Sequence, residues 1–247
     1  MAGRSNEETL AGYSNVHRYI ARAMLSRQVV TEEQLLRLVH QAQHHYLPGA
    51  GAAQMKEAVK ILEAINAKVD QHGFLIVRRL DEQKGIHKFV FISKSLTQEQ
   101  HEFEELFREE EFKLLHEVVD AIMQRSDRKI EINWLRRTER KSPLSITGYI
   151  IEQWFQREWI VYCEDRSFVT LGVRALAELQ NYLISQYRLP VCACCDFIVF
   201  TSSHKSCPVC HGVFHERCFK SYVDSVDQLA GSTCPFKDCT ARLSDIQ

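Results

Sequence analysis

The sequence has no long hydrophobic run and no apolar leader. Its longest apolar stretches, 74–77 and 89–92, hold about four residues each, whereas a helix that spans a bilayer needs roughly 20. The opening residues, MAGRSNEETLAGYSN, are polar and acidic, where a secretory signal would have a basic start and then an apolar stretch. We therefore expect neither a membrane-spanning segment nor export.

Cysteine is nearly absent from the first three quarters of the chain. Of nine cysteines only Cys163 precedes residue 190, and the other eight crowd into the tail. This distribution is typical of metal binding in a reducing compartment, the cytosol or the nucleus, rather than of a disulfide scaffold. Excess charge is absent too, because the formal net charge is −1. Any nucleic-acid contact would therefore need a local basic patch.

The composition is that of a folded, multi-domain chain. Hydrophobic residues make up 45% and charged residues 26% of the sequence, which is ordinary for a globular protein and far from the composition of disordered chains. A length of 247 residues exceeds the roughly 100–150 residues of a common domain. We therefore expect several modules.

Two similar rounds of secondary structure are predicted from apolar periodicity. The first has helices over 15–27, from Thr31 to Pro48 and from Met55 to Gly73, then a hairpin of 74–80 and 87–93. Thr31 and Gln34 have the spacing of a capping box. The second has helices over 99–123, 133–140 and 146–154, a hairpin of 159–163 and 168–171, and one closing helix over 173–187.

Helix, helix, helix, hairpin is the order of a winged-helix domain. The composition changes abruptly at Pro190. The expected fold class is therefore α+β multidomain, with two tandem winged-helix domains at 1–95 and 96–189. A small zinc-binding domain at 190–247 follows them.

The tail carries four paired metal-ligand hooks. They are Cys192-x2-Cys195, Cys207-x2-Cys210, His215-x2-Cys218 and Cys234-x4-Cys239. A tetrahedral zinc ion takes four such ligands, so four pairs predict two Zn2+ ions. The ions should be structural, because a catalytic zinc keeps one coordination position open and eight ligands over two ions leave none. Spacing alone leaves open whether the pairs join consecutively or alternately.

Four other thiols and imidazoles are predicted to be bystanders. Cys194 is an extra thiol inside the first hook, and His204 and His211 fall outside the His-x2-Cys spacing. Cys163 sits in the second predicted hairpin, where a cysteine acts as a small apolar filler.

Three segments, together with the hooks, carry a resemblance to a known family. They are VHR at 16–18, WFQREWI at 154–160 and FVTLGVRA at 168–175. With these segments the chain resembles, over nearly its whole length, the RING-containing non-SMC-element subunit of the SMC five/six chromosome complex. The RING and plant-homeodomain (PHD) fingers that the tail resembles are cross-braced. This resemblance implies alternate pairing, with Cys192, Cys195, His215 and Cys218 on one zinc and Cys207, Cys210, Cys234 and Cys239 on the other.

The resemblance also implies partners and a cellular role. It implies winged-helix domains that pack against a MAGE-family subunit, with a kleisin-like subunit close by. The chain would then be nuclear and chromosome-associated, and would act in DNA repair by homologous recombination.

A RING-type E3 ubiquitin ligase is the activity that the resemblance implies. Such a module supplies no nucleophile, because it positions a ubiquitin-charged conjugating enzyme for attack. The candidate contacts for that enzyme are Cys194, Pro235 and Phe236. Many active RINGs place a cation just after the last ligand, and here that position is Thr240. We therefore expect weak activity that rises when the MAGE partner binds.

Three alternatives remain open from the sequence. A PHD-like reader of histone tails usually has a tryptophan two positions before the seventh ligand, and that position is Ser232. A DNA-binding subunit could use a basic cluster at Arg136, Arg137, Arg140 and Lys141, or a second cluster at Arg78, Arg79, Lys84 and Lys88. The favoured interpretation of both clusters is a solvated face or a rim that contacts the protein partner. The third alternative is a non-catalytic scaffold.

The adjacent Trp154 and Phe155 raise a separate question. Neighbouring residues project to different sides of a helix, so at most one of them points into its own core. The other ring would be covered by a partner or by another part of this chain.

Overall fold

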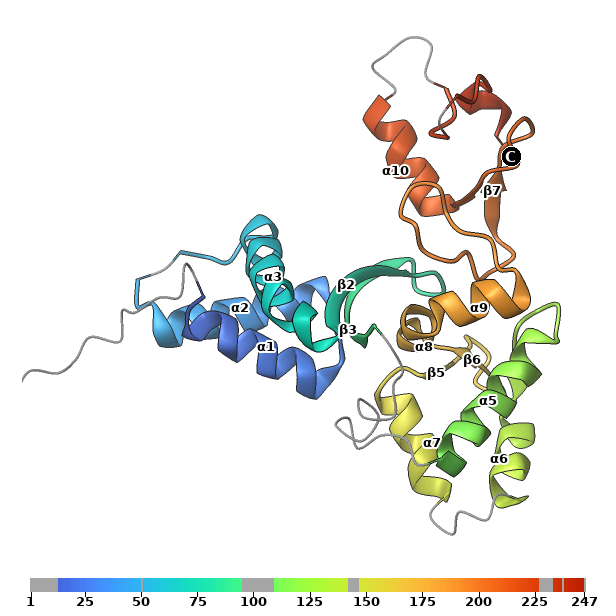
Figure 1. Cartoon of the computed structure of the whole chain (residues 1–247), viewed down its shortest axis with the longest axis horizontal. Helices are drawn as coiled ribbons and strands as arrows, with labels where there is room; N and C mark the ends of the chain where they lie inside the picture. The colour runs from blue at the N-terminus through green and yellow to red at the C-terminus, as the bar shows by residue number, and fades with distance from the viewer. Residues whose placement is uncertain are drawn as a thin grey trace, which may run out of the picture.

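The computed structural model describes residues 13–49, 51–94, 109–141, 147–226, 233–236 and 238–246. They form a first unit (13–94), a second unit (109–189) and a C-terminal module (190–246). In Figure 1 the hairpin of β2 (Phe74–Asp81) and β3 (Ile86–Ser93) leaves the first unit and reaches between the other two parts. The hairpin therefore contacts all three parts of the described chain.

The first unit contains the predicted helices and hairpin. Its elements are α1 (Asn15–Arg27), β1 (Val29–Thr31), α2 (Glu32–Tyr46), α3 (Met55–Val69), the 3-10 turn η1 (Asp70–His72), β2 and β3. The predicted capping box is confirmed, because Gln34 N donates to Thr31 Oγ1 at 3.2 Å and Thr31 N donates to Gln34 Oε1 at 2.8 Å. The short strand β1, which the sequence analysis missed, makes the sheet three-stranded and antiparallel in the order β1-β3-β2.

The second unit repeats this order. Its elements are α5 (Glu109–Met123), β4 (Ile130–Glu131), α6 (Ile132–Lys141), α7 (Thr147–Gln156), β5 (Ile160–Tyr162) and β6 (Phe168–Leu171). The sheet order is β4-β6-β5, with antiparallel pairing. The predicted helical residues 99–108 and 146 lie outside the described ranges.

The prediction of one closing helix over 173–187 is wrong. The segment is two helices, α8 (Val173–Glu178) and α9 (Gln180–Tyr187), which meet at Leu179, where φ is −91° and ψ is 9°. Five residues of α8 are buried, whereas α9 buries only Leu183. The break separates a helix that packs against β2 and β3 from one that contributes a single buried residue. Apolar periodicity continues through Leu179, so the sequence carried no sign of the break.

The β2–β3 hairpin is buried on both faces. Successive strand residues point to opposite faces. Accordingly Phe89 and Phe91 pack into the helical core of the first unit, and Val90 and Ile92 pack into the core of the second unit. Side chains of the C-terminal module, including Phe197, join that second core. The core of the second unit therefore includes side chains from all three parts, while the first unit and the C-terminal module each keep a separate cluster of their own.

The C-terminal module has little apolar core of its own. It contains β7 (His204–Ser206), β8 (Val213–His215), α10 (Glu216–Val226) and the 3-10 turn η2 (Leu243–Asp245). Its buried cluster consists of three cysteines and four other side chains, Val199, Phe214, Ala241 and Ile246. A module this small needs additional cross-links to be stable. Among the described helices, none has both the length and the apolar character to cross a membrane.

Candidate metal centre and the surfaces around it

The eight candidate ligands come together as two clusters in the C-terminal module. Within each cluster the four donor atoms all lie within 4.8 Å of one another. The members are Cys192, Cys195, His215 and Cys218 in the first cluster, and Cys207, Cys210, Cys234 and Cys239 in the second. The first and third hooks thus meet, as do the second and fourth, which is the alternate pairing that the resemblance implied.

The bystanders lie outside both clusters. Cys194, His204 and His211 are exposed, and Cys163 is half-buried directly after β5. All nine cysteines are free of disulfides.

A tight loop and a strand-to-helix junction position the ligands of the first cluster. Cys192 and Cys195 lie in a tight loop after α9, where Asp196 N bonds to Cys192 O at 2.9 Å. His215 ends β8, and Cys218 follows in the first turn of α10. Residues three apart on a helix face the same side. The strand-to-helix junction therefore delivers His215 and Cys218 together.

The distances between donor atoms fit tetrahedral zinc. For zinc–sulfur bonds of ~2.3 Å, tetrahedral geometry separates two sulfurs by about 3.8 Å. In the second cluster the Sγ atoms of Cys207 and Cys239 are 3.7 Å apart, as are those of Cys210 and Cys234. In the first, His215 Nδ1 lies 3.4 Å from Cys195 Sγ and 3.6 Å from Cys218 Sγ. Each cluster could hold one zinc ion.

The imidazole of His215 is oriented for metal binding. Its Nε2 lies 3.1 Å from the carbonyl oxygen of Ile198. A carbonyl can only accept a hydrogen bond, so Nε2 carries the proton and Nδ1 keeps its lone pair. That lone pair faces the cysteine sulfurs, which is the tautomer a metal ligand requires.

The surroundings of the second cluster shift the pKa values of its thiols in opposite directions. Burial opposes ionisation of Cys207, but hydrogen bonds from the backbone amides of Cys210 and Val209 outweigh it and lower the pKa of Cys207 to about 7. Burial raises the pKa of Cys234 to about 12. All four thiols of the cluster can be thiolates at neutral pH only beside a cation, since metal coordination deprotonates a thiol. The donor set therefore fits Zn2+ and leaves no open coordination position.

The sequence analysis missed Glu82, which lies beside the first cluster. Its side chain is 6% exposed and Oε1 lies 3.5 Å from His215 Nε2. Burial alone would raise the pKa of Glu82, but hydrogen bonds from His215, Thr201 and Phe200 outweigh it and lower that pKa. No signal in the sequence marked this residue, because a glutamate in a turn-prone stretch normally faces solvent.

The candidate contacts for a conjugating enzyme lie at the module surface. Cys194 is exposed and Pro235 is half-buried, while the ring of Phe236 is 41% exposed and packs edge-on to Phe214. A second apolar side chain, Val209, is 60% exposed within the Cys207-x2-Cys210 hook. Its position between Cys207 and Cys210 is the sequence signal that marks Val209 as a candidate contact.

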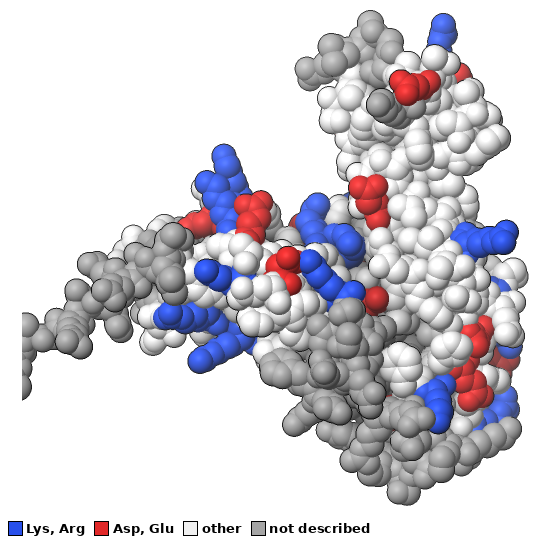
Figure 2. All heavy atoms as spheres, in the orientation of Figure 1, with Lys and Arg blue, Asp and Glu red and all other residues white. Residues whose placement is uncertain are grey.

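The two basic clusters differ in their surroundings. Arg136 and Arg137 on α6 are exposed, and the side chains of Arg140 and Lys141 lie outside the described part of the chain. Figure 2 shows that on the face in view Lys and Arg project at several separate places with acidic residues between them. The C-terminal module shows few charges on that face.

Three of the four basic side chains of the first hairpin make contacts within the molecule. Arg78 forms an ion pair with Glu32 at 2.7 Å. The guanidinium of Arg79 lies 4.9 Å from the ring centroid of Phe197. Lys88 is buried between acidic side chains, and Lys84 is exposed. The idea that these four residues form one phosphate-binding cluster does not fit this arrangement.

Fold and site together define a chain of two helix-and-hairpin units that ends in a cross-braced metal module. No known protein family matches the sequence, and no curated protein matches it. Among solved structures, a chain of the "Nse1-Nse3-Nse4 complex" has the same fold, with a TM-score of 0.67 and 14% sequence identity over 93% of this chain and 96% of that chain. At this level of identity the likeness establishes a shared fold over nearly the whole of both chains.

Proposed function

We propose that the chain is the RING-bearing non-SMC-element subunit of an SMC five/six complex. In this assignment residues 1–95 and 96–189 are winged-helix domains and 190–247 is a variant RING-type domain. The observation that carries it is a fold shared with a chain of the Nse1-Nse3-Nse4 complex over 93% of the sequence, joined to two four-ligand clusters.

Each cluster holds one structural zinc ion in this proposal. Zinc supplies cross-links that replace the missing apolar core, because binding free energy at such a site is also folding free energy. The first ion is held by Cys192, Cys195, His215 and Cys218. The second ion is held by Cys207, Cys210, Cys234 and Cys239.

The partners follow from the same assignment. The solved complex is named for Nse3 and Nse4, which correspond to the MAGE-family and kleisin-like subunits. The winged-helix domains bind the MAGE-family subunit. The protein then acts in the nucleus, on chromosomes, in DNA repair by homologous recombination.

The activity we propose is a RING-type ubiquitin ligase that acts by positioning. No side chain of the module forms a covalent intermediate. Cys194, Pro235 and Phe236 contact the conjugating enzyme, and the exposed Val209 adds apolar surface in the same module. Thr240 stands where many ligases have a cation, so activity is weak until the MAGE partner binds.

The test is reconstitution with a MAGE-family protein and a kleisin-like protein. The three chains should co-purify, native mass spectrometry should count two zinc ions in this chain, and ubiquitin chains should form with at least one conjugating enzyme. Phe236→Ala should lower ligation while the zinc count stays at two. Thr240→Arg should raise ligation without the partner. Failure of every conjugating enzyme in the complete complex would remove the ligase assignment and leave the subunit assignment standing.

A non-catalytic, DNA-binding subunit is the second candidate. The exposed Arg136 and Arg137 on α6 favour it, since side chains of this kind can neutralise phosphates. Reversing both charges should then weaken DNA binding and make its salt dependence shallower, with Arg22→Glu on α1 as the control. Unchanged affinity would exclude this use of α6. A histone-tail reader lacks support, because Ser232 stands where such a reader usually has a tryptophan.

A further inference from the structure

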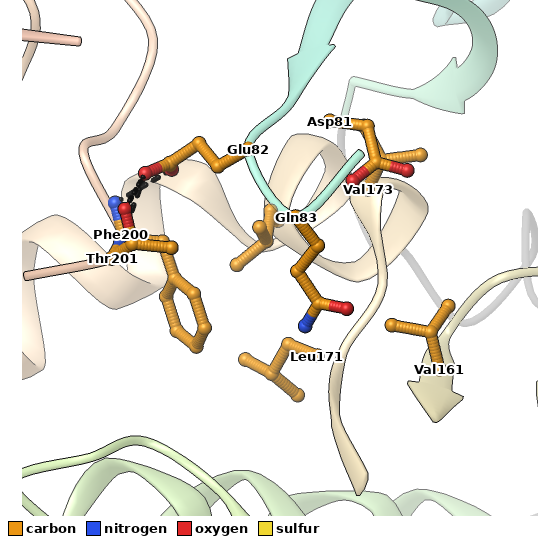
Figure 3. A pocket seen from close by; sticks show the side chains of 9 residues that line it. Asp81, Glu82, Gln83, Val161, Leu171, Val173, Phe200 and Thr201 are labelled. Carbon is orange, nitrogen blue, oxygen red and sulfur yellow. Dashed lines mark hydrogen bonds between the residues drawn. The ribbon is translucent and has the colours of Figure 1, made fainter. Parts of the chain in front are cut away.

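At the tip of the β2–β3 hairpin, the carboxylate of Glu82 forms hydrogen bonds with the C-terminal module. Glu82 accepts hydrogen bonds from Phe200 N at 2.8 Å, Thr201 N at 2.9 Å and Thr201 Oγ1 at 2.6 Å. Figure 3 shows Glu82, which together with Gln83 lines a small cavity, with its carboxylate directed toward the backbone of Phe200 and Thr201. Glu82 therefore crosses from the first unit to a segment 118 residues later.

The same carboxylate reaches the first metal cluster. Its Oε1 lies 3.5 Å from His215 Nε2, and the side chains of Glu82 and His215 are 6% and 2% exposed. Nε2–H donates to the carbonyl of Ile198 at 3.1 Å, and the Glu82 carboxylate lies beside the same nitrogen. The opposite ring nitrogen, Nδ1, faces the sulfurs of Cys195 and Cys218.

We propose that Glu82 is a positioning residue for the first zinc site, so that the first unit of the chain completes a metal site in the C-terminal module. A ligand histidine commonly donates its second N–H to a carboxylate or carbonyl, which fixes the tautomer and makes the metal-bound nitrogen a better donor. This inference rests on the proposed zinc binding. It adds that the affinity of the first site depends on a residue 110 positions before its first ligand, Cys192.

Neighbouring contacts support this arrangement. Arg217, one residue before the ligand Cys218, donates a hydrogen bond from Nη1 to the carbonyl of Gly85 in the same hairpin turn. Gly85 has a φ of +61°, which suits glycine. Arg128 donates to Phe200 O at 2.5 Å and places a positive charge near the Glu82 carboxylate. The hairpin tip thus meets the module both beside His215 and beside Cys218.

The second cluster provides an internal reference. Its four cysteines receive none of the hairpin contacts described above. Loss of Glu82 should therefore weaken one zinc site and leave the other unchanged. If Glu82 served only to hold the hairpin against the C-terminal module, its loss should instead loosen the whole module and weaken both zinc sites.

The experiment counts zinc in the full chain by native mass spectrometry at increasing chelator concentrations. Glu82→Ala should weaken the first site about 10-fold, since removal of such an outer partner costs 10–100-fold in metal affinity. A species with one zinc should then accumulate. Glu82→Gln should fall between wild type and Glu82→Ala, because the amide keeps a polar partner but lacks the charge. Wild type should hold two ions, and a lower count there would instead overturn the proposed zinc binding.

Two controls separate positioning from docking. Arg217→Gln loosens the hairpin contact beside Cys218, and Thr201→Val removes one donor to Glu82 while the carboxylate stays near His215. Both should keep zinc affinities close to wild type. With Co2+ in place of zinc, Glu82→Gln should shift the d–d bands of the site that contains His215 and leave those of the all-cysteine site unmoved. The proposal fails if Arg217→Gln matches Glu82→Ala, if both ions leave together, or if the Co2+ spectrum of Glu82→Gln is unchanged.

Discussion

Lys88 Nζ lies 2.6 Å from each carboxylate oxygen of Glu158, a residue 70 positions later in the chain. Lys88 also pairs with Asp81 at 2.9 Å, and its side chain is 2% exposed. Glu158 itself adopts a positive φ of 54°. Its carbonyl is so close to Gly172 that a Cβ there would lie 2.1 Å from it. A buried ammonium with two carboxylates therefore ties the hairpin of the first unit to a tight turn of the second.

Replacing Lys88 with methionine should destabilise the protein by about 3 kcal/mol, because removal of one partner leaves the buried opposite charges uncompensated. Urea unfolding of the zinc-loaded chain measures the change. The matched control is Lys94→Met, which breaks an exposed pair with Asp70 and should cost less than about 1 kcal/mol. Equal losses of unfolding free energy in the two variants would show that the buried ion triad stabilises the protein no more than an exposed ion pair.

The same triad predicts a dependence on alkaline pH. Burial opposes the charge of Lys88, but Glu158 and Asp81 outweigh it and raise the pKa of Lys88 above 10.5. A group whose pKa is raised by folding contributes stability that is complete below the unfolded-state pKa and is lost as pH rises through the folded-state pKa. The difference in unfolding free energy between wild type and Lys88→Met should therefore be constant from pH 8 to about 10 and shrink above that. A difference that grows above pH 10 would contradict the pairing.

Gly212 should not tolerate alanine. A Cβ at this position would lie 2.2 Å from the ring of Phe236 and 3.3 Å from Cys210 Sγ. Gly212→Ala should displace Phe236, lower ubiquitin ligation in the reconstituted complex and make the second zinc easier to chelate. Gly51→Ala is the control, because no atom lies within 4 Å of a Cβ there. Wild-type ligation and zinc retention by Gly212→Ala would mean that the ring position is unimportant.

Trp154 and Phe155 should differ sharply when each is truncated. Trp154 is 1% exposed in the core of the second unit, so Trp154→Ala should cost about 3–5 kcal/mol. Phe155 is half-buried and stacks on Tyr162 with ring centroids 4.2 Å apart. Phe155→Ala should cost about 1–2 kcal/mol, which includes the loss of the aromatic pair. Thermal unfolding of both variants decides the order, and a larger loss for Phe155→Ala would be incompatible with this packing.

Most elements were predictable because their signals are local. The capping box of Thr31 and Gln34 needs only four consecutive residues, and the hairpin 74–93 is marked by two β-branched runs around a turn. The short strands 29–31 and 130–131 were missed, because two or three residues carry no periodicity. The break at Leu179 was missed because both helices continue one apolar pattern.

The candidate metal site was also only partly predictable from local sequence patterns. Hook spacing identified all eight cluster residues, because two ligands of a pair must reach one ion from one loop. It left the pairing of hooks open, and only the resemblance to cross-braced fingers supplied it. The DNA-binding alternative placed Arg79 and Lys88 in one basic cluster, whereas the fold places Arg79 over Phe197 and Lys88 in a buried ion triad.

By itself the sequence determined the ligand set, the capping box at the start of the second helix and the order of the longer elements, since each depends on residues within a few positions of one another. Tertiary structure decided which hooks meet in one cluster, where the first hairpin docks, and that Glu82 and Lys88 contact parts of the chain 70 or more positions away. The physical reason is that a charged side chain in a turn has the same local pattern whether it meets water or a partner. Only the packing of the hairpin between the other two parts removes the water and supplies that partner.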